Sequence, residues 1–242
     1  WFVNFEPVHA NKENIPSTSA SPEIAKLFPS DFKNGIPKGW RIGILRDCCI
    51  RVESGGTPSR KVPNYWTDGS VPWLTSGEVR EPIVLTTKQY ISSEGLDNSN
   101  AKLWPKGTTV VAMYGATAGE VCLLANEMTA NQACCGMLPK KDYRSFLFIK
   151  ALQSKNDLAN KSSGSAQQNL NQSIVANFPT LLPDEKCIKP YEQITGRFID
   201  KWIANEEQNT VLSEIRDSLL PRLISGKIRV GDAEKTLEME AA

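Results

Sequence analysis

Hydrophobic residues between positions 187 and 224 recur at alternating steps of three and four. This period is typical of a helix that packs along its length against another helix. At ~1.5 Å per residue such a helix would extend roughly 55 Å, further than the core of a compact domain requires. The pattern therefore predicts a globular region followed by one long coiled-coil helix. The positions expected to face the partner helix are Ile188, Tyr191, Thr195, Phe198, Trp202, Asn205, Asn209, Leu212, Arg216, Leu219 and Leu223.

Two of these positions, Asn205 and Asn209, are asparagines. A buried asparagine weakens a helix pair but fixes its register and its partner, so we expect specific pairing. The alternative is a helix that folds back along its own globular region. Acidic residues favour a helix start at Glu185, although a start nearer Tyr191 is also compatible with the sequence. Gly226 is expected to terminate the helix.

Residues 40–183 have a different pattern, with short β-like runs separated by glycine and proline. The runs at 110–113 and 121–124 are continuously apolar, which indicates strands within the core. A helical pattern follows from Phe146 to about Leu158. These features predict an α+β domain with a mixed, curved sheet and a few helices. The expected strands cover residues 41–45, 71–75, 84–90, 108–114, 120–125 and 133–138.

These changes in pattern divide the chain into four expected parts. Residues 1–38 are mostly polar and without a hydrophobic period, which indicates a connector. Residues 39–184 form the expected domain, residues 185–226 the long helix, and residues 227–242 a C-terminal tail. The chain begins with Trp1 rather than Met, which favours a piece of a longer protein.

The composition is that of a soluble globular protein, with 40% hydrophobic residues, 23% charged residues and a net charge of +1. No stretch approaches the ~20 apolar residues that span a bilayer, and the first residues do not form a signal peptide. The six cysteines lie mostly in apolar runs, which indicates buried, reduced thiols rather than a disulfide framework. The single histidine, His9, is far from any cysteine, so no zinc site is expected.

The chain also lacks the common catalytic motifs. It contains no G-x-x-x-x-G-K-[ST] phosphate loop and no G-x-S-x-G nucleophile elbow. The segment 115–119 has glycines at both ends but lacks the lysine and the length of a phosphate loop. A protein without enzymatic activity, metal or cofactor of its own is therefore expected.

Three loops rich in glycine and hydroxyl residues follow expected strands: the first loop (residues 54–61), the second (75–78) and the third (114–119). Glycine allows a ligand to approach the backbone, and hydroxyl groups suit phosphate oxygens. The alternative is that these glycines only form hairpin turns. The candidate binding residues are Thr57, Ser59, Arg60, Lys61, Thr75, Ser76, Glu78, Tyr114, Thr117 and Gly119.

A fourth loop (residues 164–171) is rich in amide side chains. Gln and Asn can offer a donor and an acceptor together, which is the pairing that reads an adenine edge in the major groove. The alternative is a solvated polar loop. The candidates here are Gly164, Gln167, Gln168, Asn169 and Asn171.

The order of these segments resembles the specificity subunit of type I restriction-modification systems. The segments GGTPSR, PNYW, VPWLTSGEV, VVAMYGATAGEVCLL, NQACCGMLP, GSAQQNLNQ and LLPRLISGKIRV follow one another within residues 36–230. Each segment is weak evidence alone, whereas their order over one domain is specific. The chain is similar to the C-terminal half of such a subunit, with one target recognition domain and the distal conserved helix. Residues 1–38 resemble the central conserved region.

The resemblance implies that the domain reads one half of a bipartite target in double-stranded DNA, with the four loops facing the DNA. The long helix would set the spacing between the two halves. Adenine methylation and DNA cleavage would belong to separate modification and restriction subunits, in the cytoplasm and away from membranes. A natural half-subunit that forms a homodimer through the long helix is an alternative. An adaptor that binds protein and an enzyme with an unfamiliar site are the rival interpretations.

Overall fold

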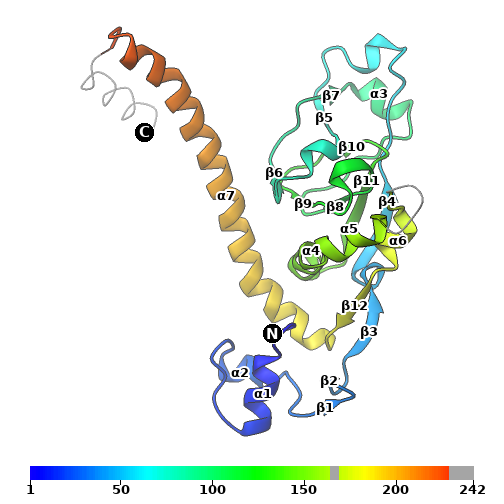
Figure 1. The fold of residues 1–242 in the computed structure, drawn as a ribbon, viewed down its shortest axis with the longest axis vertical. Helices are drawn as coiled ribbons and strands as arrows, with labels where there is room; N and C mark the ends of the chain where they lie inside the picture. Colours follow the sequence, from blue (N-terminus) through cyan, green and yellow to red (C-terminus); the bar gives the residue numbers. More distant parts are fainter. Residues whose placement is uncertain (164–168, 229–242) are drawn as a thin grey trace. The chain divides into compact units, whose positions relative to one another are not determined.

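The computed structural model describes residues 1–163 and 169–228 (Figure 1). The chain divides into two compact units, Trp1–Ile199 and Asp200–Ala242. Of the predicted site residues, Gly164, Gln167 and Gln168 lie outside the described residues. All strands among the described residues lie in the first unit.

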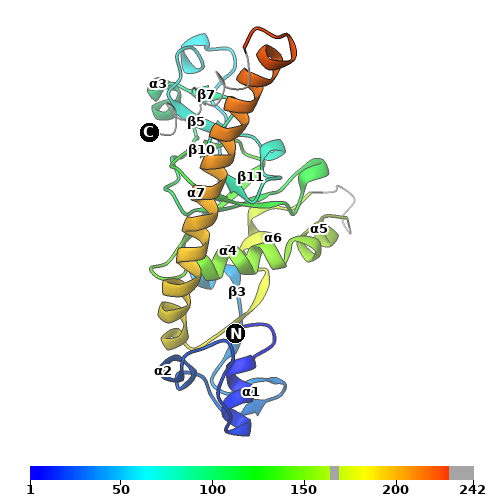
Figure 2. The same cartoon turned by 90° about the vertical axis from the view of Figure 1, so that its left-hand side faces the viewer.

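The largest sheet of the first unit has five strands in the order β4-β11-β8-β9-β6. Its neighbours are antiparallel, except that β6 runs parallel to β9. Every residue of β8 and β9 is buried, because their continuous apolar sequence is covered on both faces, on one of them by helix α4 (Figure 2). The strands are β4 (Cys49–Ser54), β6 (Ile83–Val84), β8 (Thr109–Ala112), β9 (Val121–Leu124) and β11 (Cys134–Pro139).

Three smaller sheets complete the first unit. The order β10-β5-β7 joins Thr129–Ala130, Val71–Leu74 and Tyr90–Ile91, with β10 parallel and β7 antiparallel to β5. Two antiparallel pairs are formed by β3 (Arg41–Ile44) with β12 (Pro179–Leu182), and by β1 (Phe32–Lys33) with β2 (Ile36–Pro37). The predicted α+β class with mixed sheets is confirmed, although the strands are distributed over four sheets.

Five of the six predicted strands are confirmed within one or two residues, and the strand expected at 84–90 is wrong. There the chain forms two short strands, β6 and β7, because Thr87 interrupts the run. Its hydroxyl donates to the Gln89 carbonyl at 2.6 Å and accepts from the Trp73 amide at 3.1 Å. Strand β4 was not predicted from the sequence, because its buried and exposed positions do not alternate.

The expected helix from Phe146 to Leu158 consists of two helices, α4 (Arg144–Gln153) and α5 (Lys155–Ser163). They separate at Ser154, whose hydroxyl donates to the carbonyl of Lys150 at 2.9 Å. Such a bond competes with the helical hydrogen bonds and favours an interruption. The other short helices are α1 (Glu6–Glu13), α2 (Pro22–Ala25), α3 (Ser93–Asp97) and α6 (Gln172–Ala176).

The long helix α7 covers Glu185–Ile224, 40 residues and ~60 Å. The start at Glu185 is confirmed, and the start nearer Tyr191 is wrong. Gly226 ends the helix as expected, with a φ of 70° and its N–H donating to Leu223 at 3.0 Å. No helix within the described residues is long and apolar enough to cross a membrane.

The N-terminal residues pack into the first unit rather than extending from it. The Phe2 ring contacts Trp40 and Phe146, with centroids 5.6 and 5.2 Å away, and Tyr191 of α7 at 4.8 Å. Asn11 donates to the carbonyl groups of Ala25, the last residue of α2, and of Phe28 just after it, which fixes α1 against α2. Aromatic contacts of this kind add to the free energy of burial. They therefore hold the first turns of α7 against the N-terminal residues. The division at residues 38 and 39 stays a prediction.

All six cysteines are buried and free, as the sequence predicts. Within the described ranges, no group of three or more His, Cys, Asp or Glu residues could hold a metal ion.

Glu6 gives the N-terminal part a pH dependence. Desolvation raises the pKa of Glu6, but hydrogen bonds from Ser17, Ser19 and Thr18 outweigh it and hold this pKa at about 2. Because the folded value lies below the ordinary 4.5, these contacts stabilise the fold above pH 4.5 and are lost as the pH falls toward 2. We expect Glu6→Gln to lower the free energy of unfolding by about 1 kcal/mol or less at pH 5.5, given its exposure to solvent.

At pH 3.5 this difference between Glu6→Gln and the unmodified chain should shrink, as measured by urea unfolding. Glu13→Gln, in the same helix, gives the baseline. A difference that grows on acidification would contradict the assignment.

Candidate nucleic-acid interface

The first loop leaves β4 through two closely packed glycines. A Cβ atom on Gly55 would lie 2.3 Å from the carbonyl oxygen of Ala130, and one on Gly56 would lie 2.4 Å from that of Asn100. Real Cβ atoms do not approach backbone so closely, so both positions require glycine. The Thr57 hydroxyl then bonds to the side chain of Gln132. The loop therefore starts from a fixed backbone before Ser59, Arg60 and Lys61, which are exposed.

The guanidinium of Arg60 is held by aromatic rings and an amide. It lies 3.3 Å from the ring centroid of Trp66 and 5.0 Å from that of Trp73. Its Nη2 donates to Oε1 of Gln89 at 2.6 Å. This group lines an open cavity of about 440 Å³ together with Lys88 and Gln89. Arg60 was predicted from the sequence, whereas Trp66, Lys88 and Gln89 were not, because they lie outside the first loop in the sequence and only the fold brings them to Arg60.

The second loop is a compact 3₁₀ turn, Ser76–Glu78, closed by its own side chains. Oε2 of Glu78 accepts from the amide and the hydroxyl of Thr75 at 3.0 and 2.6 Å, while Oε1 accepts from the amide of Lys88 at 2.8 Å. Both oxygens of Glu78 are therefore engaged within the protein. Thr75, Ser76 and Glu78 are half-buried, and the turn places Lys88 and Gln89 beside the first loop.

The third and fourth loops lie against each other. Tyr114 forms an antiparallel bridge with Asn169, and the amide of Leu170 donates to the Met113 carbonyl at 2.8 Å. The Asn171 side chain accepts from the amide of Ile174 at 2.8 Å and so caps α6. Tyr114, Asn169 and Asn171 are exposed at this junction.

The remaining candidates of the third loop are buried. Gly119 has a φ of 90°, and a Cβ there would lie 2.7 Å from the amide nitrogen of Ala159 in α5. The Thr117 hydroxyl donates to the carbonyl of Tyr114 at 3.3 Å. Both residues shape the loop from within.

Gln172, another residue that the sequence analysis missed, connects the fourth loop to the first. Its Nε2 donates to the Val52 carbonyl at 2.7 Å, and its Oε1 accepts from Ser54 at 3.2 Å. The end of β4 thereby contacts the start of α6. Among the described residues, the first loop contacts Gln89, which follows the Lys88 amide bound by the second loop. It also contacts Gln172, which follows the fourth loop, and the fourth loop contacts the third through Asn169 and Tyr114.

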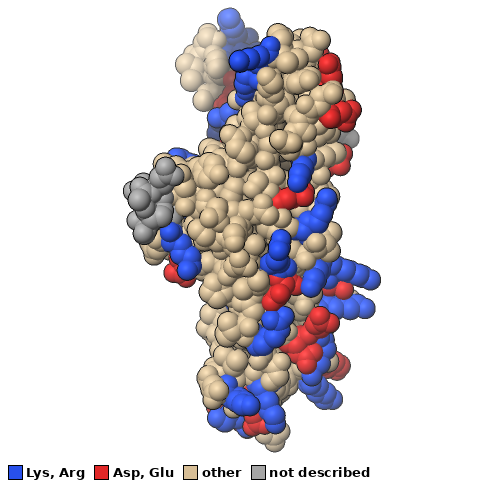
Figure 3. Space-filling model, turned by 90° about the vertical axis from the view of Figure 1, so that its right-hand side faces the viewer, with Lys and Arg blue, Asp and Glu red and all other residues tan. Residues whose placement is uncertain are grey.

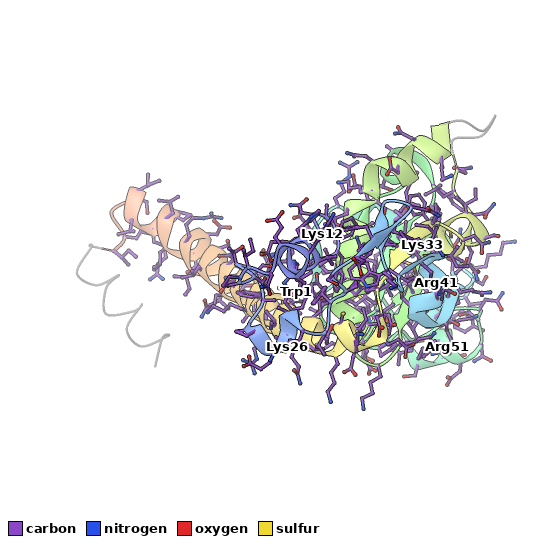
Figure 4. The ribbon with its side chains drawn as sticks, turned by 90° about the horizontal axis from the view of Figure 1, so that it is seen from below. Trp1, Lys12, Lys26, Lys33, Arg41 and Arg51 are labelled. Carbon is purple, nitrogen blue, oxygen red and sulfur yellow. The ribbon has the colours of Figure 1, made fainter. Side chains whose placement is uncertain are left out.

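Charges on the first unit are mixed rather than gathered into one basic field. On the face in Figure 3, lysine and arginine side chains alternate with acidic ones. Figure 4 labels Lys12, Lys26 and Lys33 of the N-terminal segment together with Arg41 of β3 and Arg51 of β4. These two arginines face carboxylates, Asp47 at 3.0 Å and Glu53 at 3.9 Å. Arg60, by contrast, has no carboxylate within 4.0 Å among residues 1–163 and 169–228.

Helix α7 has a covered side and an open side within the first unit. Ile199 is 2% exposed, while its neighbour Phe198 is 71% exposed. Hydrogen bonds from the start of α4 fix the covered side. Glu192 accepts from the amide of Ser145 at 2.7 Å and from Nε of Arg144 at 3.2 Å, and the Gly196 carbonyl accepts from Nη2 of Arg144 at 3.2 Å.

In the second unit, several of the predicted pairing positions are accessible. Leu212 is 60% exposed, and Asn205 and Asn209 are exposed as well. Trp202 and Leu223 are half-buried, and Leu219 is 7% exposed. An exposed leucine flanked by exposed asparagines at this spacing is compatible with a helix partner, whereas Leu219 is already covered in this structure.

Comparison with known proteins identifies the relatives of this arrangement. The specificity subunit of the type I restriction enzyme HindI from Haemophilus influenzae is 28% identical over 94% of this chain and 59% of its own length. The MjaIX specificity subunit from Methanocaldococcus jannaschii is 24% identical over 95% of this chain and 51% of its own length. The chain thus spans between half and three-fifths of these relatives.

Solved structures share the fold. The type I restriction-modification S subunit from M. genitalium matches with a TM-score of 0.58 and 12% identity, over 89% of this chain and 51% of that one. The HsdS subunit from Thermoanaerobacter tengcongensis matches with a TM-score of 0.52 and 13% identity, over 89% and 52%. The family model of the type I restriction modification DNA specificity domain matches residues 37–215, and the chain belongs to this family.

Proposed function

We propose that this chain recognises one half of a bipartite double-stranded DNA target for a type I restriction-modification complex. The observation that carries the proposal is the family match over residues 37–215, which includes all four loops. The convergence of the loops through Gln89, Asn169 and Gln172 supports it, because sequence readout needs several side chains at one surface.

Within this proposal, the exposed members of the loops contact DNA. Thr57, Ser59, Arg60, Lys61, Tyr114, Asn169 and Asn171 are accessible for such contacts. The half-buried second loop and the buried Thr117 and Gly119 hold the backbone in place. Gly164, Gln167 and Gln168, which lie outside the described residues, remain candidates for contacts with DNA. Amide side chains in the fourth loop suit the edges of bases, and the hydroxyl-rich first loop suits phosphates.

The partners follow from the same proposal. Modification subunits would methylate adenine and restriction subunits would cleave DNA, so the chain itself performs no catalysis and needs no cofactor. The complex would act in the cytoplasm. The open face of α7 would pair with a second helix and hold two recognition domains apart, within a longer subunit or within a homodimer. The proposed parts remain residues 1–38, 39–184, 185–226 and 227–242.

Replacing Gln167, Gln168 and Asn169 together by alanine tests the fourth loop. We expect binding to the matched duplex to weaken about 10- to 100-fold, since a good base contact is worth about 1–3 kcal/mol, while binding to a scrambled duplex stays unchanged. The matched duplex is defined by sequencing methylated sites in cells that express the complex. Gel-shift titrations of the complex with both duplexes provide the measurement.

A matched control replaces Gln153, Asn156 and Asn160 by alanine, which removes the same number of amides from α4 and α5. Equal losses on matched and scrambled DNA would rule out base reading by the fourth loop. A complex whose methylation pattern does not depend on this chain would refute the proposed function.

A further inference from the structure

Arg60 of the first loop is held by aromatic and amide contacts and pairs with no carboxylate among the described residues. Its guanidinium rests on Trp66 at 3.3 Å and bonds to Gln89 at 2.6 Å. Trp73, the second ring beside it, is 4% exposed, and its own N–H donates to the Gly56 carbonyl at 3.0 Å. Stacking on rigid rings reduces the entropy that an arginine loses when it binds a ligand. The guanidinium is therefore in place before a ligand arrives.

The charge at this place is not neutralised by the protein. Two cations, Arg60 and Lys88, line the cavity, and Asp68 is the one carboxylate among its lining residues. Asp68 forms no ion pair with Arg60 or Lys88 within 4.0 Å in the described part of the chain. The Gln89 contact occupies one N–H of Arg60 with a neutral acceptor. An open site with net positive charge of this kind favours an anion.

We propose that the cavity lined by Arg60, Lys88 and Gln89 binds a phosphate of the DNA backbone. The inference rests on the proposed function, since it assumes that the chain binds DNA. An arginine that reads guanine must extend to the floor of a groove about 8.5 Å deep. Arg60 instead lies flat against Trp66 and lines a recess. Phosphates protrude from the duplex and can enter such a recess, while base edges cannot.

The site also explains the closed second loop. Glu78 accepts from the Lys88 amide at 2.8 Å, and Thr87 bonds to the Gln89 carbonyl at 2.6 Å. These contacts fix the backbone on both sides of the Lys88 and Gln89 side chains. Lys88 would supply a point charge, Arg60 a planar pair of donors, and Gln89 would act as a positioning residue for Arg60.

The test measures binding of the complex to a 30-bp duplex of mixed sequence at several KCl concentrations. Each neutralised phosphate contributes about 0.9 to the slope of log K against log salt. We expect Arg60→Ala to lower this slope by about 0.9 and to weaken matched and scrambled duplexes equally. Lys88→Ala, whose side chain supports no described contact in the fold, should also lower the slope. Arg60→Lys should keep the slope, and Gln89→Leu should weaken binding without changing it.

Arg51→Ala is the matched control, because Arg51 is an exposed arginine that already faces Glu53 at 3.9 Å. Thermal unfolding of each variant separates misfolding from lost binding, and Lys88→Ala decides the question if Arg60→Ala does not fold. An unchanged slope in both cavity variants, with DNA binding intact, would overturn the phosphate site alone. Relaxed selection at a single base pair in Arg60→Ala would assign Arg60 to base reading instead. If the unmodified complex binds no DNA, the proposed function fails together with this site.

Discussion

Trp104→Ala is expected to lower the free energy of unfolding by about 3–5 kcal/mol, the usual cost of removing a large buried aromatic side chain. Trp104 is fully buried, and its ring lies so close to Gly136 of β11 that a Cβ there would be 2.6 Å from it. Its N–H also donates to Oε1 of Glu53 at 3.0 Å. The substitution therefore creates a cavity. It also removes the N–H donor of Trp104 from Oε1 of Glu53 in β4.

Urea unfolding followed by circular dichroism measures this effect. Leu103→Ala is the matched control, because Leu103 precedes Trp104 and is 38% exposed, so its loss should cost less than about 1 kcal/mol. Trp104→Phe should fall between the two, since it keeps a six-membered ring but loses the rest of the indole together with its N–H. Equal losses for the alanine variants at 103 and 104 would show that the ring does not hold the sheet together.

Leu212→Lys is expected to weaken pairing of helix α7 at least 100-fold. Phe198 and Leu212, 71% and 60% exposed, are separated by about four turns at a period of 3.5 and share one side of the helix. A lysine at one of these pairing positions places a charge where two paired helices would bury a leucine, at a cost of several kcal/mol. Light scattering at concentrations from micromolar upward measures the mass of the particles that form.

Val211→Lys provides the control within the same turn. Val211 is 53% exposed, comparable with Leu212, but it points about 100° away around the helix and is not a predicted pairing position. We expect this variant to pair like the unmodified chain. If both lysine variants reduce pairing equally, the predicted pairing positions of α7 are wrong. If the unmodified chain is monomeric at every concentration, the partner of α7 is not a second copy.

Features with strong local signals were predictable from the sequence. The continuous apolar runs of β8 and β9 and the long period of α7 each determine an element without help from distant residues. The interruptions were less predictable. Ser154 and Thr87 divide predicted elements through local hydrogen bonds of their hydroxyl groups, although a residue of either type could also have continued the element. β4 was missed because its strand is defined by pairing with β11, a contact between distant segments.

The candidate site was predictable as a set of loops but not as a surface. Glycine and hydroxyl residues marked the four loops, whereas Gln89 and Gln172 are ordinary polar residues until the fold places them beside Arg60 and Ser54. The two interpretations of the glycines, close approach of a ligand or a simple turn, can also be distinguished only from the folded structure. Gly119 is required by its contact with α5, while the exposed Tyr114 begins the same loop.

The six reduced cysteines can report how often local segments of the folded protein open. Burial raises the pKa of Cys49, Cys135 and Cys187 to about 12, so their thiols are almost entirely protonated near neutrality. Only the thiolate attacks alkylating reagents, and these side chains are shielded as well. Alkylation in the absence of denaturant must therefore wait for each segment to open, and its rate reports the frequency of that event. Cys49 lies on an edge strand, Cys135 in the sheet interior and Cys187 at the base of α7, where its Sγ is 3.4 Å from the Leu27 carbonyl oxygen. The order in which mass spectrometry finds them modified would rank these three regions by how readily they detach.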